Sequence, residues 1–111
     1  MNYHDKKFKM VSNSYNGEVS TDIIFHYHQV GHMIHCTYSG GYILLGHLIG
    51  RVESDFSINL NYHQINVRNE ISTGICHSTP EILPNWKIRI HEKWQWTSGD
   101  LSEGVSILEE I

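Results

Sequence analysis

Residues 86–97 have the sequence WKIRIHEKWQWT, and this stretch indicates the fold class most clearly. Tryptophan or isoleucine stands at almost every second position, and charged or polar residues fill the positions between them. Successive side chains of a β-strand point to opposite faces of the sheet, so a period of two predicts a strand with one buried face. The predicted buried face carries Trp86, Ile88, Ile90, Glu92, Trp94 and Trp96.

The same period of two extends over most of the chain, and glycine, asparagine and serine interrupt it at short intervals. This pattern predicts short strands joined by turns, with little or no helix. We expect strands at residues 7–13, 22–29, 32–39, 42–53, 56–66, 71–78, 86–97 and 104–110. Between the sixth and the seventh strand, Pro80 and Pro84 predict a longer connection, because proline cannot donate to a sheet ladder.

Eight strands in sequence predict an all-β, mainly antiparallel up-and-down sheet, formed by residues 1–111 as a single domain. An open sheet of this kind leaves two bare edges, which natural proteins usually remove by closing the sheet. The interior of an eight-stranded barrel is just wide enough for side chains or one small ligand. We therefore expect a closed β-barrel, with an open or split sheet as the alternative.

The composition narrows the classes of function. Eight Lys and Arg against twelve Asp and Glu give a net charge of −4, which argues against a general nucleic-acid binder. The longest apolar run, residues 42–45, is too short to span a membrane, and we expect no signal peptide. Cys36 and Cys76 form no CxxC pair, so we expect free thiols in a reducing, cytoplasmic compartment.

A minority of polar residues falls on the predicted inner face. Glu92 stands out most, because it lies between Ile90 and Trp94, and a buried carboxylate must be paired, hydrogen-bonded or protonated. Strand register, which the sequence does not fix, decides whether Glu92 meets His47, Tyr62 or, if strands 86–97 and 104–110 form a hairpin, Glu109. The candidate ligand-binding residues are Tyr38, His47, Tyr62, Gln64, Glu92, Trp94, Trp96 and Glu109.

Two interpretations of this inner face remain open. In the first, Glu92, Tyr62 and His47 orient a small, partly apolar ligand between tryptophan walls. This interpretation predicts a cavity of at least roughly 300 Å³, the usual scale of ligand pockets. In the second, the polar side chains form an internal hydrogen-bond network, or Glu92 faces water near the rim of the barrel.

Nine histidines are the other notable feature of the composition. His26 and His28 share the outer face of one predicted strand, and His35 falls on the matching face of the next. Three imidazoles around one zinc ion would make a typical catalytic metal shell. The spacing fits any histidine-rich solvated face equally well, so we predict no metal and no other cofactor, and keep these three residues as a weak metal-site candidate.

Three segments of the chain resemble a known group of proteins: GHLIG at residues 46–50, YHQ at 62–64 and HEKWQWTSGD at 91–100. From Phe8 to the C-terminus the chain resembles small bacterial proteins of about this length, many of which carry the name N-acetylglutamate synthase. That name implies acetyl transfer from acetyl-CoA to glutamate. The strand pattern of the group also resembles the calycin type of small barrel, the architecture of lipocalins and avidin-like proteins.

The sequence leaves three functions open. The first is a barrel that binds a small molecule in its interior. The second is an enzyme, such as the implied acetyltransferase, with Glu92 or His47 as general base. The third is a structural or interaction module with a filled barrel, whose working surface, and a possible homodimer contact, is formed by Arg89, His91, Lys93 and Gln95.

Overall fold

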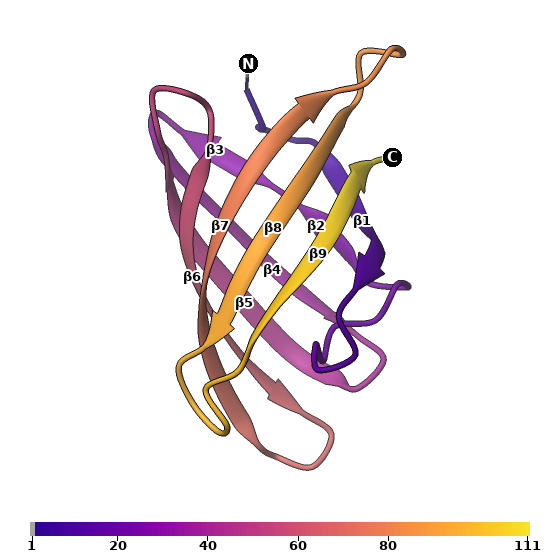
Figure 1. Cartoon of the computed structure of the whole chain (residues 1–111), viewed down its shortest axis with the longest axis vertical. Coiled ribbons are helices and arrows are strands. Elements are labelled where there is room, and N and C mark those ends of the chain that lie inside the picture. Colours follow the sequence, from indigo (N-terminus) through magenta and orange to yellow (C-terminus); the bar gives the residue numbers. More distant parts are fainter. Residues whose placement is uncertain (1) are drawn as a thin grey trace.

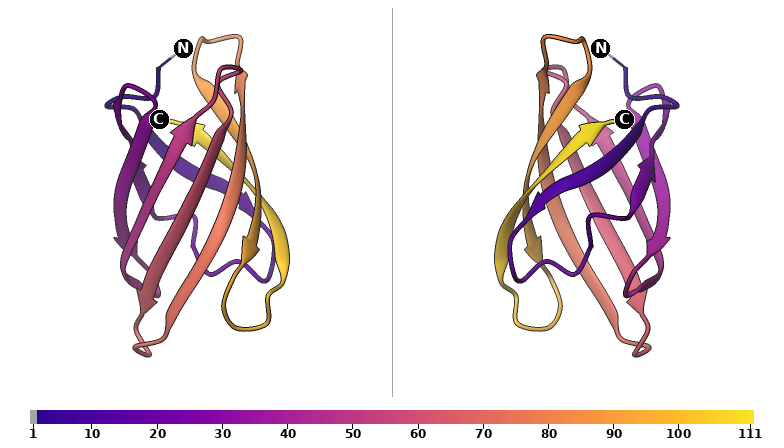
Figure 2. Two further views of the ribbon diagram at one scale, coloured as in Figure 1. Left: turned by 90° about the vertical axis from the view of Figure 1, so that its left-hand side faces the viewer. Right: turned by 90° about the vertical axis from the view of Figure 1, so that its right-hand side faces the viewer.

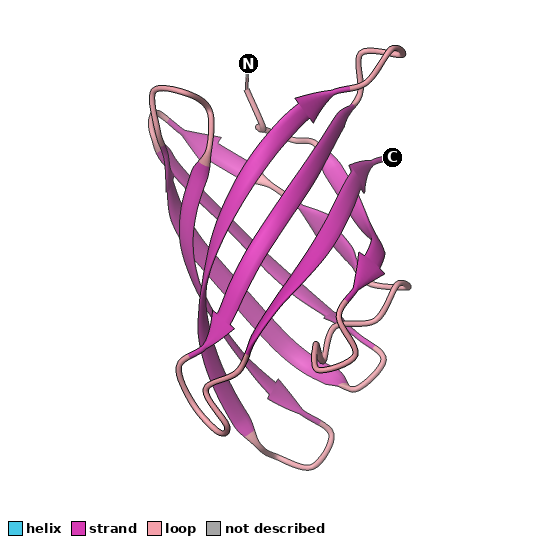
Figure 3. Cartoon of the chain, in the orientation of Figure 1, coloured by secondary structure: helices cyan, strands magenta, loops and turns pink. Residues whose placement is uncertain are grey.

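Nine β-strands follow one another along the chain in the computed structural model, which describes residues 2–111 (Figure 1). They are β1 (Lys7–Asn13), β2 (Ile24–His26), β3 (His28–Val30), β4 (Met33–Gly40), β5 (Ile43–Val52), β6 (Ile58–Asn66), β7 (Ile71–Ile82), β8 (Ile88–Trp96) and β9 (Glu103–Glu110). Loops connect them, and no helix occurs in the described residues (Figure 3). The predicted all-β class is confirmed. Accordingly, residues 2–111 contain no helix that is long and apolar enough to cross a membrane.

The sheet nearly closes because the segment that was predicted as the second strand, residues 22–29, pairs with one neighbour through its first half and with another through its second half. β2 pairs with β1, β3 pairs with β4, and only Tyr27 separates β2 from β3. The strand predicted at residues 22–29 is therefore interrupted once, which raises the count from eight to nine. β1 also pairs with β9, so the first and last strands complete a nearly closed antiparallel barrel (Figure 2).

Pro80 lies inside β7, where we expected a loop. The β6–β7 ladder ends at the pair formed by Ile58 and Ser78, so beyond Ser78 the strand pairs with β8 alone. Proline is tolerated on such a free edge, because the missing N–H is not required there. The turn is confined to residues 83–87, and Trp86, predicted to be buried, lies in it with φ 69° and 85% of its surface exposed.

The inner face of β5 differs from the prediction because of a β-bulge. The β5–β6 ladder shifts register between Ile43 and Leu45, so that Leu44 and Leu45 are both exposed. Beyond the bulge Gly46 and Leu48 are buried, and the strand presents the opposite face from the one that a regular alternation predicts. His47 was therefore placed wrongly: it lies on the outer surface.

The inner face of β9 was also predicted wrongly. Ser106 and Leu108 are buried, whereas Val105 is exposed. Directly opposed residues of an antiparallel pair lie on the same face, and Ser106 opposes Glu92. Glu109 consequently points outward, where the Arg89 guanidinium donates to its carboxylate at 2.8 Å. Of the contacts that the sequence left open for Glu92, the pair with Glu109 does not form.

Aromatic side chains seal the end of the barrel near the N-terminus. Tyr3 is fully buried, and its hydroxyl donates to the carbonyl oxygen of Phe56. The rings of Tyr3 and Phe8 lie 6.4 and 5.0 Å from that of Tyr27, measured between centroids. The β1–β2 loop (residues 14–23) lies toward the opposite end of the barrel (Figure 1).

Candidate ligand-binding site

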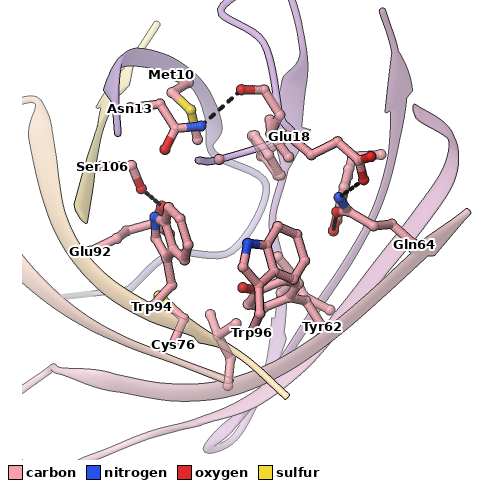
Figure 4. A pocket seen from close by; sticks show the side chains of 16 residues that line it. Met10, Asn13, Glu18, Tyr62, Gln64, Cys76, Glu92, Trp94, Trp96 and Ser106 are labelled. Atoms are coloured by element: carbon pink, nitrogen blue, oxygen red, sulfur yellow. Dashed lines mark hydrogen bonds between the residues drawn. The ribbon is translucent and has the colours of Figure 1, made fainter. Parts of the chain in front are cut away.

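A cavity of about 60 Å³ lies inside the barrel at the end crossed by the β1–β2 loop (Figure 4). This volume is far below the size that we expected, because aromatic rings and the loop itself fill most of the space. The lining residues come from every strand except β3 and from the loop: Met10, Asn13, Gly17, Glu18, Val19, Phe25, Tyr38, Leu48, Leu60, Tyr62, Gln64, Cys76, Glu92, Trp94, Trp96 and Ser106.

The structure brings six of the eight candidate ligand-binding residues together around this cavity. These six are Tyr38, Tyr62, Gln64, Glu92, Trp94 and Trp96. The other two, His47 and Glu109, lie on the outer surface for the reasons given above. His47 has its nearest aromatic neighbour there, His63, with ring centroids 5.2 Å apart.

Glu92 is the acidic group in the deep part of the cavity. The hydroxyl of Ser106, its cross-strand partner, donates to the carboxylate at 2.7 Å. Enclosure by the barrel wall raises the pKa of Glu92, because burial disfavours the charged form, while hydrogen bonds from Ser106 and Cys76 oppose the shift. The cavity therefore contains a carboxyl group that is more easily protonated than an exposed glutamate.

We expect the free energy of unfolding of the Glu92→Gln variant to depend less on pH than that of the wild type. Because the pKa is raised in the folded state, the folded protein holds this proton more tightly than the unfolded chain. The free energy of unfolding of the wild type should therefore fall as pH rises from below the ordinary glutamate value of 4.5 through the raised value. The neutral glutamine should flatten this fall, so that the variant gains on the wild type as pH rises above the ordinary glutamate value of 4.5.

Urea unfolding at several pH values measures this effect. Glu103→Gln is the matched control, since Glu103 is an exposed glutamate on the neighbouring strand β9. An identical pH dependence in the wild type and in Glu92→Gln would show that Glu92 titrates as an exposed group does.

Glycines of neighbouring strands seat the aromatic walls. Tyr62 lies across Gly74, its cross-strand partner on β7, and a Cβ added there would lie 2.2 Å from the phenol Cζ. Trp94 lies across Gly104 in the same way, and a Cβ added to Gly104 would lie 2.2 Å from Cζ2 of the indole. Only a residue without a side chain leaves room for these rings to lie along the wall.

Hydrogen bonds join the shallow part of the cavity to the β1–β2 loop. The Tyr38 hydroxyl donates to Gln64 Oε1 at 2.7 Å, and Gln64 Nε2 donates to Glu18 Oε1 at 2.8 Å. Asn66 Nδ2 donates to the second oxygen of Glu18, also at 2.8 Å. The chain of contacts runs from β4 through β6 to the loop, and it closes this side of the mouth.

The outer histidines come together as predicted, but they form no metal site in the structure. The ring centroids of His26 and His28 are 4.5 Å apart, and those of His28 and His35 are 5.4 Å apart. His26 Nε2 contacts the carboxylate of Asp5 at 2.6 Å, and His4 lies beside His28. Within residues 2–111 no three or more His, Cys, Asp or Glu side chains are placed to hold a metal ion.

Several lining residues were missed in the sequence. Ser106 lies on the opposite face of its strand from Glu109, which was predicted to point inward, and Glu18 lies in a segment without the period of two. Asn13 reaches the cavity after the β1–β9 register shifts between Met10 and Ser12, which alternation alone does not reveal. Gly74, inside the strand predicted at residues 71–78, was one available signal of the cavity wall. A glycine within a strand often marks a place where another group approaches the backbone closely.

A family model described as "Avidin-like protein" matches residues 1–111, the whole chain. No curated protein matches the chain, and no solved structure matches it. The calycin-like barrel expected from the resemblance is thus confirmed by the family match and by the strand topology together.

Proposed function

The chain belongs to the avidin-like protein family, and we propose that it binds a small molecule inside the barrel, at the end covered by the β1–β2 loop. One observation carries the proposal: Glu92, Tyr62 and two tryptophans face one cavity inside the barrel, whose core is largely apolar (Figure 4). Ligand pockets typically combine apolar and aromatic walls with a few polar groups that fix orientation.

The proposed ligand has a partly apolar body and a hydrogen-bond donor. The rings of Trp94 and Trp96, whose centroids are 5.7 Å apart in an edge-to-face arrangement, offer apolar contact area. Glu92 accepts from the hydroxyl of Ser106 and the thiol of Cys76, and its carboxyl oxygens retain further acceptor capacity toward the cavity. An N–H or O–H group of the ligand would use that capacity.

The size of the cavity limits what can bind while the barrel is closed. A cavity of about 60 Å³ is smaller than the roughly 150 Å³ needed to hold benzene in an engineered protein core. A ligand of more than a few heavy atoms therefore requires displacement of the β1–β2 loop. The acetyltransferase alternative receives no support from the comparisons or from the barrel.

Native mass spectrometry of the purified protein, compared with its denatured mass, tests the proposal directly. We expect a retained small molecule, or saturable binding of biotin, the first probe for an avidin-like barrel, by isothermal titration. Glu92→Leu should weaken binding at least about tenfold, because the donor of the ligand loses its acceptor. Glu103→Leu, on the exposed side of β9, is the matched control. A protein that retains nothing, and whose binding of biotin is unaffected by Glu92→Leu, would contradict the proposal.

A further inference from the structure

The carboxylate of Glu18 is held at the mouth of the barrel by two side-chain amides of β6. Gln64 Nε2 donates to one carboxylate oxygen and Asn66 Nδ2 to the other, each at 2.8 Å. Gln64 and Asn66 are buried and point inward from the same face of the strand. Two parallel N–H donors that engage both oxygens form a pocket for a carboxylate, whatever molecule carries it.

Barrel side chains also hold the rest of the loop over the cavity. Asn13 Nδ2 donates to the carbonyl oxygen of Val19 at 3.0 Å. The indole N–H of Trp96 donates to the backbone carbonyl oxygen of Asn16 at 3.2 Å. Val19 packs on the hydrophobic core. Each of these bonds joins the loop to a residue of the cavity wall, so lifting the loop would uncover the cavity.

The charge on Glu18 is poorly compensated in this position. Among residues 2–111, no lysine, arginine or histidine forms an ion pair with it. A second carboxylate, that of Glu70, accepts from the same Asn66 amide nitrogen at 2.8 Å, so two negative groups share one donor. Like charges repel each other, and this repulsion offsets part of the stabilisation that the two amide hydrogen bonds give to the closed loop.

We propose that Glu18 is an internal stand-in for a carboxylate of the ligand, so that the β1–β2 loop is a self-latched lid. When a carboxylate-bearing ligand enters, its carboxylate takes the amides of Gln64 and Asn66, and Glu18 moves into solvent with the loop. This assignment rests on the proposed function and adds to it a ligand class: an organic acid with an apolar body. It also accounts for the small volume of the closed cavity.

Chemical rescue of a Glu18→Ala variant by propionate tests the latch. The variant leaves both amides without their carboxylate, and propionate supplies one. Trp96 reports the lid directly through its bond to Asn16, and Trp86→Phe removes the signal of the exposed Trp86. In the Trp86→Phe background, we expect propionate to change the fluorescence of Glu18→Ala saturably and to raise its Tm. The protein with Glu18 intact should respond at least about tenfold more weakly, since its own carboxylate competes.

Amide hydrogen exchange over residues 14–23 gives a second readout that needs no ligand. Exchange of the Gly17 N–H, which is bonded to the carbonyl oxygen of Ser14, should be about tenfold faster in Glu18→Ala, and propionate should slow it again. Glu70→Ala is the matched control, because Glu70 accepts from the same Asn66 nitrogen but lies outside the loop. Potassium chloride at equal ionic strength controls for salt. Should Glu18→Ala fail to fold, Glu18→Gln keeps the size of the side chain and removes its charge.

Equal responses to propionate with and without Glu18, or an equal response in Glu70→Ala and Glu18→Ala, would overturn the latch. Unchanged exchange of residues 14–23 in Glu18→Ala would overturn it as well. These failures are separate from failure of the proposed function. A neutral ligand retained in native mass spectrometry without any propionate rescue would leave the binding barrel standing and remove the latch.

Discussion

Replacing Tyr3 with alanine should lower the free energy of unfolding by about 3–5 kcal/mol, the cost of deleting a fully buried aromatic side chain. Tyr3 has no exposed surface, contacts the ring of Tyr27, and donates its hydroxyl to the carbonyl oxygen of Phe56. The side chain closes the end of the barrel opposite the β1–β2 loop. Its removal exposes core residues to water in addition to the lost contacts.

Urea unfolding followed by circular dichroism measures this effect. Tyr15→Ala is the matched control, since Tyr15 is fully exposed in the β1–β2 loop and should change stability by less than about 0.5 kcal/mol. Tyr3→Phe isolates the hydroxyl, and we expect a loss of about 1 kcal/mol for that single hydrogen bond. Equal stability of Tyr3→Ala and the wild type would show that this end of the barrel does not need its plug.

The plug has a consequence for binding. With one end of the barrel sealed by packed aromatic rings, a ligand can reach the cavity only from the end covered by the β1–β2 loop. Tyr3 also fixes the position of Gln29, whose Oε1 accepts from the Tyr3 amide at 3.0 Å. The closed end is thus tied to β3, the strand segment that completes the barrel.

Strand positions could be predicted from the sequence because a period of two is a local property. On β6 and β8 the alternation continues without a bulge, and Tyr62, Glu92 and Trp94 were placed correctly on the inner face. On β5 one extra residue near Leu44 reverses the face of everything that follows, which explains the error at His47. A bulge depends on pairing with another strand, so one strand alone does not reveal it.

The cavity could not be predicted in the same way, because its size depends on contacts between distant segments. Glu18 and Gln64 are 46 residues apart, and Asn16 and Trp96 are 80 apart. The sequence places the Glu92 carboxyl group and four aromatic candidate residues on the inner face, but whether a loop fills the space between them depends on tertiary packing. The hypothesis of an internal hydrogen-bond network therefore holds in part: Glu92 with Ser106, and Tyr38 with Gln64, are such contacts.

Substituting alanine for Gly104 should destabilise the barrel by about 1–3 kcal/mol, although alanine is normally well tolerated in place of glycine at an ordinary backbone conformation. A Cβ at this position would lie 2.2 Å from Cζ2 of the Trp94 ring. Trp94 is 8% exposed and packed in the core, so the indole cannot simply swing outward. The ring must therefore turn toward the cavity, and a cavity of about 60 Å³ would be filled by the displaced indole.

A double-mutant cycle with Trp94→Leu separates this clash from any general intolerance of β9 to a side chain. If the ring causes the penalty, Gly104→Ala should cost at least about 1 kcal/mol less when Trp94→Leu is already present. Urea unfolding gives the four stabilities, and near-ultraviolet circular dichroism reports the tryptophan environment. A penalty of the same size in both backgrounds would mean that the glycine serves the backbone of β9. A penalty that disappears together with the indole would show that Gly104 shapes the cavity by leaving room for the Trp94 ring, which connects this position to the binding site although glycine has no side chain of its own.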